Sequence, residues 1–166
     1  MANTANPRGF SPVQPILRMR EYVKGTATKF FPGDAVVLRP DGKLYVAATA
    51  GTTLAGVAVG YSTAAATRAL IYDDPNQQYY IQDDGVGGTL AQADIGAGMD
   101  IVVTAGNTTF LKSAQAADTS TKNTATGARA LLLLGFHPDD TVGKYVRCRV
   151  VFNAAKNPQT RGSTFM

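Results

Sequence analysis

The side chains best suited to chemistry in this sequence are one histidine and one cysteine. His137 stands in Phe-His-Pro-Asp-Asp, where a His–Asp pair could form. A general base must lie within reach of the proton it removes, and the residue order around His137 matches no nucleophile–base arrangement. A single histidine also excludes a multi-histidine metal site. Cys148 cannot form an internal disulfide and lies near no nucleophile motif, so we interpret it as a small buried hydrophobe.

Three Asp-Asp pairs and one glycine run are the other candidates for chemistry. Adjacent strand residues point to opposite faces, so Asp73-Asp74, Asp83-Asp84 and Asp139-Asp140 are poor catalytic dyads. They could offer oxygens to calcium, but their order matches no EF-hand loop. The glycines at 85–88 precede a short helical pattern without the Gly-Lys-Ser/Thr of a phosphate loop. We therefore expect no enzymatic activity, no metal and no cofactor.

Length and composition favour one β-rich domain. The chain has 166 residues, enough for a substantial core, and only 17% of them are charged. Among the acidic residues, Glu21 is the one glutamate, and the aspartates that make up the rest favour turns over helix interiors. The first ten residues contain no apolar signal-peptide core, and no apolar run approaches the roughly 20 residues of a membrane span. We expect a soluble protein made in the cytoplasm.

Positive charge gathers at the two ends of the chain. The net charge is +4. Residues 1–29 hold five cationic side chains against Glu21, which already gives +4, and the last thirteen residues add Lys156 and Arg161. Basic termini can touch nucleic acid, but these lack dense Lys/Arg clusters with interleaved aromatic residues. Direct nucleic-acid binding is therefore not expected.

The elements that would position these residues are organised around the stretch 33–61. Its pattern predicts three consecutive strands at 35–39, 44–48 and 54–61, and Asp41-Gly42 between the first two is a strong hairpin signal. The third run is small and apolar and contains Gly56 and Gly60. Such a strand has neighbours on both faces, and its glycines indicate a bulge or a close backbone approach.

The rest of the chain predicts further short strands and one helix. A short helix is expected at 89–95, capped by Thr89, and the polar segment 113–127 is expected to be an exposed loop. The alternation in 144–153 places Val146, Cys148, Val150 and Phe152 inward. The remaining strands are expected at 22–24, 28–31, 68–72, 77–82, 99–103, 108–112 and 128–136, the last covered on both faces. Short strands at intervals of roughly ten residues indicate a compact all-β barrel or sandwich.

Three regions follow from this pattern: an extended N-terminal arm at 1–17, a β-barrel or sandwich domain at 18–153 and a C-terminal tail at 154–166. Prolines at 7, 12 and 15 oppose regular structure in the arm. Apolar residues between them leave two interpretations, a floppy terminus or an arm that docks on a neighbouring molecule or subunit.

Several motifs in one order resemble the small head decoration (cement) proteins of tailed bacteriophages. They are NPRGFSPV in the arm, GDAVVLRPDGKL and LAGVAVGYS in the central stretch, then YYIQDDG, LAQADIGAGMDIVV and LLLLGFHPDDTVGKYVRCRVVFN. Together they span roughly residues 6–153. The segment 113–127 and the C-terminal tail have no counterpart in the resemblance.

This resemblance implies a β-tulip-like body on the outer surface of an icosahedral capsid in the virion. Such a protein binds during or after shell expansion, bridges neighbouring subunits of the major capsid protein and resists internal DNA pressure, often as a dimer or trimer. Phe10, Val13, Ile16 and Leu17 are then candidate apolar anchors. Arg8, Arg18 and Arg20 are candidates to pair with capsid acids, and Arg147 and Arg149 are weaker candidates.

A carbohydrate-binding or receptor-binding β-module on the virion surface is the alternative function. Tyr45, Tyr79 and Tyr80 could stack on sugar rings, although tyrosines also pack readily in the wall of a β domain.

Overall fold

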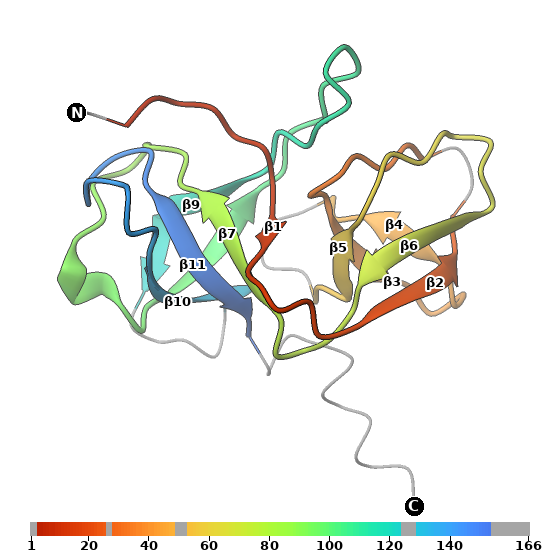
Figure 1. Cartoon of the computed structure of the whole chain (residues 1–166), viewed down its shortest axis with the longest axis horizontal. Helices are drawn as coiled ribbons and strands as arrows, with labels where there is room; N and C mark the ends of the chain where they lie inside the picture. The colour runs from red at the N-terminus through yellow and green to blue at the C-terminus, as the bar shows by residue number, and fades with distance from the viewer. Residues whose placement is uncertain (1–2, 26–27, 49–52, 124–128, 154–166) are drawn as a thin grey trace, which may run out of the picture.

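A computed structural model describes residues 3–25, 28–48, 53–123 and 129–153, and it is nearly all β. The strands form two antiparallel sheets that lie side by side in Figure 1. In spatial order, the six-stranded sheet contains β1 (Ser11–Pro12), β7 (Gln78–Gln82), β11 (Arg147–Phe152), β10 (Leu131–Phe136), β8 (Gly98–Val102) and β9 (Ala116–Asn123). The five-stranded sheet contains β2 (Met19–Val23), β6 (Arg68–Tyr72), β5 (Gly56–Ala58), β3 (Ala35–Leu38) and β4 (Leu44–Val46).

Neither sheet closes into a barrel, so the all-β prediction is confirmed as a compact sandwich of two curved sheets. Isolated bridges join Lys24, just after β2, with Leu44 of β4, and Asp83, just after β7, with Ala117 of β9. The first of these bridges draws the two border strands of the five-stranded sheet together at one end. The predicted helix is reduced to one 3₁₀ turn, η1 (Gln92–Asp94). Its N-cap is Ala91, and not Thr89, because Asp94 Oδ2 accepts the Ala91 N–H at 2.8 Å.

The stretch 33–61 forms the three predicted strands, with shorter bounds. β3 lies between β4 and β5 in the sheet. The β3–β4 hairpin turns at Gly42, whose φ of 74° suits glycine, and Arg39 N–H donates to Lys43 O at 3.0 Å. A Cβ on Gly56 would lie 2.3 Å from Tyr72 O. The predicted close backbone approach is therefore confirmed at Gly56.

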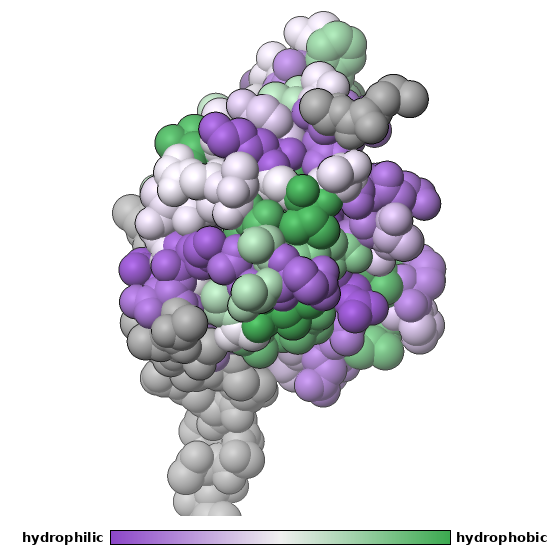
Figure 2. Space-filling model, turned by 90° about the vertical axis from the view of Figure 1, so that its left-hand side faces the viewer, coloured by the Kyte–Doolittle hydropathy of each residue, from purple (hydrophilic) through white to green (hydrophobic). Residues whose placement is uncertain are grey.

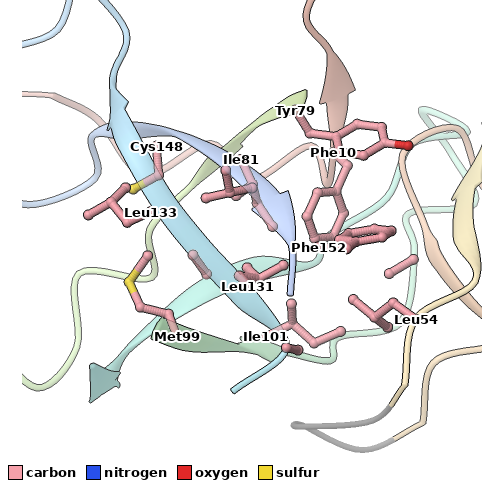
Figure 3. Packing of buried hydrophobic residues seen from close by; sticks show 14 of the residues in the cluster. Phe10, Leu54, Tyr79, Ile81, Met99, Ile101, Leu131, Leu133, Cys148 and Phe152 are labelled. Carbon is pink, nitrogen blue, oxygen red and sulfur yellow. The ribbon is translucent and has the colours of Figure 1, made fainter. Parts of the chain in front are cut away.

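The core joins the two sheets (Figure 3). Val146, Cys148, Val150 and Phe152 are buried, as their alternation predicts. Leu54 and Val57 extend the same cluster into the five-stranded sheet. β10 is covered less completely than its sequence predicts. Leu131 and Leu133 are buried, but Leu132 and Leu134 are half-buried on the outer face. Figure 2 shows an apolar patch among polar side chains on the side of the molecule that lies at the left in Figure 1.

Two predictions between β8 and β10 are wrong. The predicted strand 108–112 is a turn, in which Asn107 Oδ1 accepts the N–H groups of Thr109 and Phe110, both at 2.9 Å. The predicted exposed loop 113–127 contains the eight-residue strand β9, and its last four residues lie outside the described part of the chain. β9 is a strand because β8 supplies a ladder, including Ile101 opposite Ala117, that the polar composition does not reveal.

The described part of the arm, 3–17, lies on the chain's own body. Ser11 pairs with Tyr80 and Pro12 with Tyr79, so β1 is an edge strand of the six-stranded sheet. Gly9 approaches so closely that a Cβ there would lie 2.3 Å from Gly33 O. The predicted tail at 154–166 lies outside the described residues. In the described residues, no helix is long and apolar enough to span a bilayer.

Candidate docking surface

The arm is held in place by buried groups that belong to the rest of the chain. Phe10 is 3% exposed, and its ring centroid lies 5.8 Å from that of Tyr79 and 5.5 Å from that of Phe152. Phe10 is therefore a core residue and is withdrawn from the candidate contact residues. The sequence marks it only as an apolar residue among prolines, and the aromatic cluster that receives it comes from β7 and β11.

Gln77, just before β7, fastens the second half of the arm. Its side chain is buried, its Oε1 accepts the Leu17 N–H at 2.9 Å, and its Nε2 donates to Val13 O at 2.8 Å. These bonds leave Val13 and Ile16 half-buried, whereas Leu17 is 49% exposed. Nothing in the sequence around Gln77 distinguishes it from an ordinary strand residue, so its role was missed.

Beyond Leu17, exposed apolar side chains continue along β2 and onto β6. The register places Met19 opposite Tyr72, Glu21 opposite Leu70 and Val23 opposite Arg68, so these residues share one face of the sheet. We call the exposed apolar residues here the β2 face: Leu17, Met19, Val23 and Leu70, each between 42% and 49% exposed. Alternation along both strands is the signal that could have found Met19 and Leu70, because Ala69 and Ile71 are buried on the opposite face.

β2 is a border strand of its sheet, and among the described residues its outer edge is open from Met19 to Glu21. Its C-terminal end is bridged to β4, where Gly25 N–H donates to Leu44 O at 2.8 Å. Lys24 N–H donates to Thr67 O at 2.8 Å, and Asp73 N–H donates to Arg18 O at 3.4 Å. Residues that exchange such bonds alternate along an antiparallel pair, so the backbone groups of Met19, Glu21 and Val23 point away from β6. A border strand of this kind is a template for strand addition.

Of the basic candidates near this edge, Arg18 is engaged within the chain. Its Nε lies 2.7 Å from Asp73 Oδ1 and its Nη2 donates to Asp73 O at 2.8 Å. The Asp73 side chain has no exposed surface and also accepts the Tyr22 hydroxyl at 2.7 Å. This hydrogen bonding raises the pKa of the Arg18 guanidinium. Arg18 therefore anchors β2 to β6. Arg20 Nε also lies 3.8 Å from Asp73 Oδ2, but the Arg20 side chain remains 58% exposed.

The other basic candidates lie on the six-stranded sheet, away from the β2 face. Arg147 binds Asp140 through two nitrogens, with Nη2–Oδ1 at 2.6 Å and Nε–Oδ2 at 3.0 Å, which lowers the pKa of the Asp140 carboxyl. Arg149 is exposed on the outer face, opposite Gly135. Arg8 is exposed on the arm. The nine candidates are thus dispersed, and only Leu17, Arg18 and Arg20 gather at the β2 edge.

Cys148 and His137 are the two side chains best suited to chemistry in the sequence. Cys148 is fully buried, which raises the pKa of its thiol and confirms its prediction as a buried hydrophobe. His137 follows β10, where its Nδ1 accepts the Asp139 N–H at 3.2 Å. Of the tyrosines considered for sugar stacking, Tyr79 is buried in the core. Tyr45, on β4, donates a hydrogen bond from its hydroxyl to Asp41 Oδ2 at 2.9 Å. Within the described ranges, no three His, Cys, Asp or Glu side chains form a group able to hold a metal ion.

A projecting loop carries the most exposed large apolar side chain among the described residues. Phe110 is 71% exposed and Leu111 is 44% exposed at the turn between β8 and β9. Figure 1 shows this segment rising above both sheets. Leu111 has φ 47°, and Lys112 Nζ donates to Asn6 Oδ1 at 3.0 Å, which ties the loop to the arm. The sequence pattern was interpreted as a strand, so this loop was missed.

Comparison with protein-family models, with curated proteins and with solved structures finds no match to the chain.

Proposed function

We propose that this protein binds the outer surface of an assembled icosahedral capsid and cements neighbouring subunits of the major capsid protein. The motif order that resembles bacteriophage decoration proteins motivates this proposal. The all-β sandwich is consistent with it, and so is the gathering of Leu17 and Arg20 at an open sheet edge.

The observation that carries the proposal is the combination of the β2 face with the open β2 edge. The β2 face offers apolar area that is removed from water on docking. Its four residues form a row, whereas exposed apolar residues on an ordinary surface are scattered singly. The outward backbone groups of Met19 and Glu21 can pair with an extended capsid segment. Main-chain hydrogen bonds would supply affinity and the apolar row would supply register.

Binding of this kind stabilises the shell by linkage. A ligand that binds the assembled shell and not the free subunit shifts the equilibrium toward assembly. Many copies on one shell multiply the effect, and a dimer or trimer of this chain would bind with higher avidity than one copy. We propose the virion surface as the site of action, after synthesis in the host cytoplasm.

Strand addition can be tested with a proline at an outward-facing position. Glu21→Pro removes a backbone donor that points away from β6, so the sheet should keep its ladder while the edge loses a partner site. We expect the variant to stay folded and to lose cosedimentation with expanded shells of the major capsid protein of the virus that encodes this chain. Circular dichroism and cosedimentation are the measurements.

The apolar row has its own test and a matched control. Met19→Ser together with Leu70→Ser should weaken shell binding by about tenfold or more, because each apolar side chain buried on docking contributes on the order of 1 kcal/mol. Val86→Ser changes a side chain that is 62% exposed on the other sheet's side and should bind like the wild type. Wild-type protein that does not bind shells would overturn the proposed function. Wild-type binding that survives all the β2 changes would instead move the contact to another face.

A further inference from the structure

A groove lies between the N-terminal arm and the surface of the six-stranded sheet. It has a volume of about 740 Å³, within the range of small-molecule sites. The arm residues 3–9 form one wall, and the ends of β7 and β11 form the other. Bonds from side chains hold the arm in this position: Asn3 Nδ2 donates to Thr141 O at 2.7 Å, and Gln82 Oε1 accepts the Asn6 N–H at 2.6 Å. The groove therefore has a preformed shape.

Aromatic rings line this groove. Tyr80 points outward from β7, beside Ser11 of the arm, and its ring centroid lies 4.8 Å from that of His137. Tyr145 lines the same groove, and its ring packs on the backbone of Gly85, where a Cβ would lie 2.4 Å from the ring. The half-buried Tyr80 and Tyr145 rings offer apolar surface with a hydroxyl at one end.

A charged pair supplies planar hydrogen-bonding groups beside the rings. Arg147 and Asp140 line the groove, and their two-nitrogen contact fixes the plane of the guanidinium. The Arg147 side chain is 43% exposed, while that of Asp140 is 11% exposed. Because Asp140 balances the charge of Arg147, the pair offers N–H donors and carboxylate oxygens without much net charge. This pair suits a ligand with hydroxyl groups, and the exposed Arg8, which also lines the groove, adds a positive charge that can pair with an acidic group of such a ligand.

The backbone at Tyr145 is held in an unusual conformation. Its φ is 56°, in the left-handed region that bulky residues rarely adopt. Gln82 Nε2 donates to Tyr145 O at 2.8 Å, so a side chain of the groove wall helps to hold this conformation. Strained residues that persist cluster at ligand sites, and here the strain places an aromatic ring in a groove.

We propose that this groove binds a short carbohydrate. The C–H face of a sugar ring would pack on Tyr80 or Tyr145, and its hydroxyl groups would bond to Arg147, Asp140 and the arm backbone. The proposal keeps Tyr80 from the earlier tyrosine hypothesis and replaces Tyr79 and Tyr45 with Tyr145, because Tyr79 is buried and Tyr45 lies on the other sheet. It is independent of capsid binding.

A glycan array with the full-length protein tests the proposal, using neutral and acidic oligosaccharides as probes. Each hit is then titrated by isothermal calorimetry. Tyr80→Ala should raise the dissociation constant about tenfold or more, because it removes a stacking surface. Tyr145→Gly should do the same, and glycine adopts the left-handed φ without strain, so this variant keeps its fold. Tyr45→Ala is the matched control and should bind like the wild type.

Several outcomes would overturn the proposal. They are the absence of binding by any oligosaccharide, unchanged affinity in folded Tyr145→Gly, and equal loss of affinity in Tyr45→Ala. Saturable binding of inorganic phosphate to the groove, seen by NMR titration without any saccharide binding, would also overturn it. Shell cosedimentation is measured separately, so failure of the glycan test leaves the capsid proposal unchanged.

Discussion

At the scale of single residues, buried polar groups hold segments together where apolar packing is thin. Lys24 is 4% exposed and its Nζ donates to Thr28 O, Ser62 Oγ and Thr63 O, and burial lowers its pKa. Asp34 and Asp83 are also buried, and burial raises the pKa of both carboxyls. Each keeps one carboxylate oxygen without a hydrogen-bond partner among the described residues. Such residues stabilise the fold in one protonation state more than in the other.

Asp83 gives a pH dependence with a defined sign. Its pKa in the folded protein lies above the ordinary value of 3.8 expected in the unfolded chain. The folded state therefore binds the proton more tightly, and the contribution of Asp83 to stability falls as pH rises from 3.8 through the folded pKa. Asp83→Asn keeps an oxygen for Gly85 N–H and the Thr119 hydroxyl. We expect Asp83→Asn to be more stable than the wild type at pH 7, with the difference shrinking toward pH 4.

Urea unfolding at several pH values measures this difference. Asp139→Asn is the control, because the Asp139 side chain is 80% exposed and its substitution should change stability little at any pH. A variant Asp83→Asn that is less stable than the wild type at pH 7 would contradict the assigned cost of ionising this group.

At the scale of elements, the arm is an integral strand of the six-stranded sheet. β1 pairs with β7, Phe10 enters the core, and Gln77 fastens the segment that follows. The sequence left two interpretations of residues 1–17, a floppy terminus or an arm that docks on a neighbouring molecule or subunit, and neither makes the segment part of the core. Removal of this segment would open the aromatic cluster of Phe10, Tyr79 and Phe152. The described part of the arm therefore contributes to the stability of the chain's own body.

Phe10 and Phe110 give a matched pair of substitutions that separate the two roles of phenylalanine in this chain. Phe10→Ala should lower the free energy of unfolding by about 3–5 kcal/mol, because it leaves a cavity in the core. Phe110→Ala should change it by less than about 0.5 kcal/mol, because Phe110 is 71% exposed. Chemical denaturation of both variants measures the contrast. Equal, small losses in the two variants would show that Phe10 is not part of the folded core.

At the scale of the whole molecule, one core serves both sheets. The larger buried cluster takes Tyr79, Ile81 and Leu131 from the six-stranded sheet and Val57 from the five-stranded sheet. The smaller cluster, around Phe30, Leu44 and Ile71, packs on the face of the five-stranded sheet opposite to Val57. Shared burial couples the sheets, so neither can lose its structure without exposing apolar surface of the other.

This shared core predicts a single cooperative unfolding transition. Val57→Ala and Leu131→Ala change different sheets, yet both should lower the midpoint of the same transition, with Leu131→Ala costing about 2–5 kcal/mol. Differential scanning calorimetry measures this, and the calorimetric and van't Hoff enthalpies should agree. Two resolved transitions, each sensitive to only one of the substitutions, would mean that the sheets fold as separate units.

Local patterns were sufficient to predict much of the fold. The strand at 68–72 was predicted with its observed bounds, and Asp41-Gly42 placed the β3–β4 hairpin. Strict alternation in β11 assigned its buried face. Of the candidate contact residues, Leu17 and Arg20 are exposed at the β2 edge, whereas Phe10 lies in the core. These successes rest on periodicity and turn chemistry, which act within a few residues.

By itself, the sequence determined most of the strands, where glycine and aspartate turn the chain and which residues of β11 face inward. The tertiary structure alone decided that the polar segment after Gln115 is a strand, that Arg18 and Arg147 are bound by Asp73 and Asp140, and that Tyr80 faces a groove. The physical reason is range. Strand and turn preferences come from neighbouring residues, but ladder partners, ion pairs and grooves depend on residues far apart in the chain.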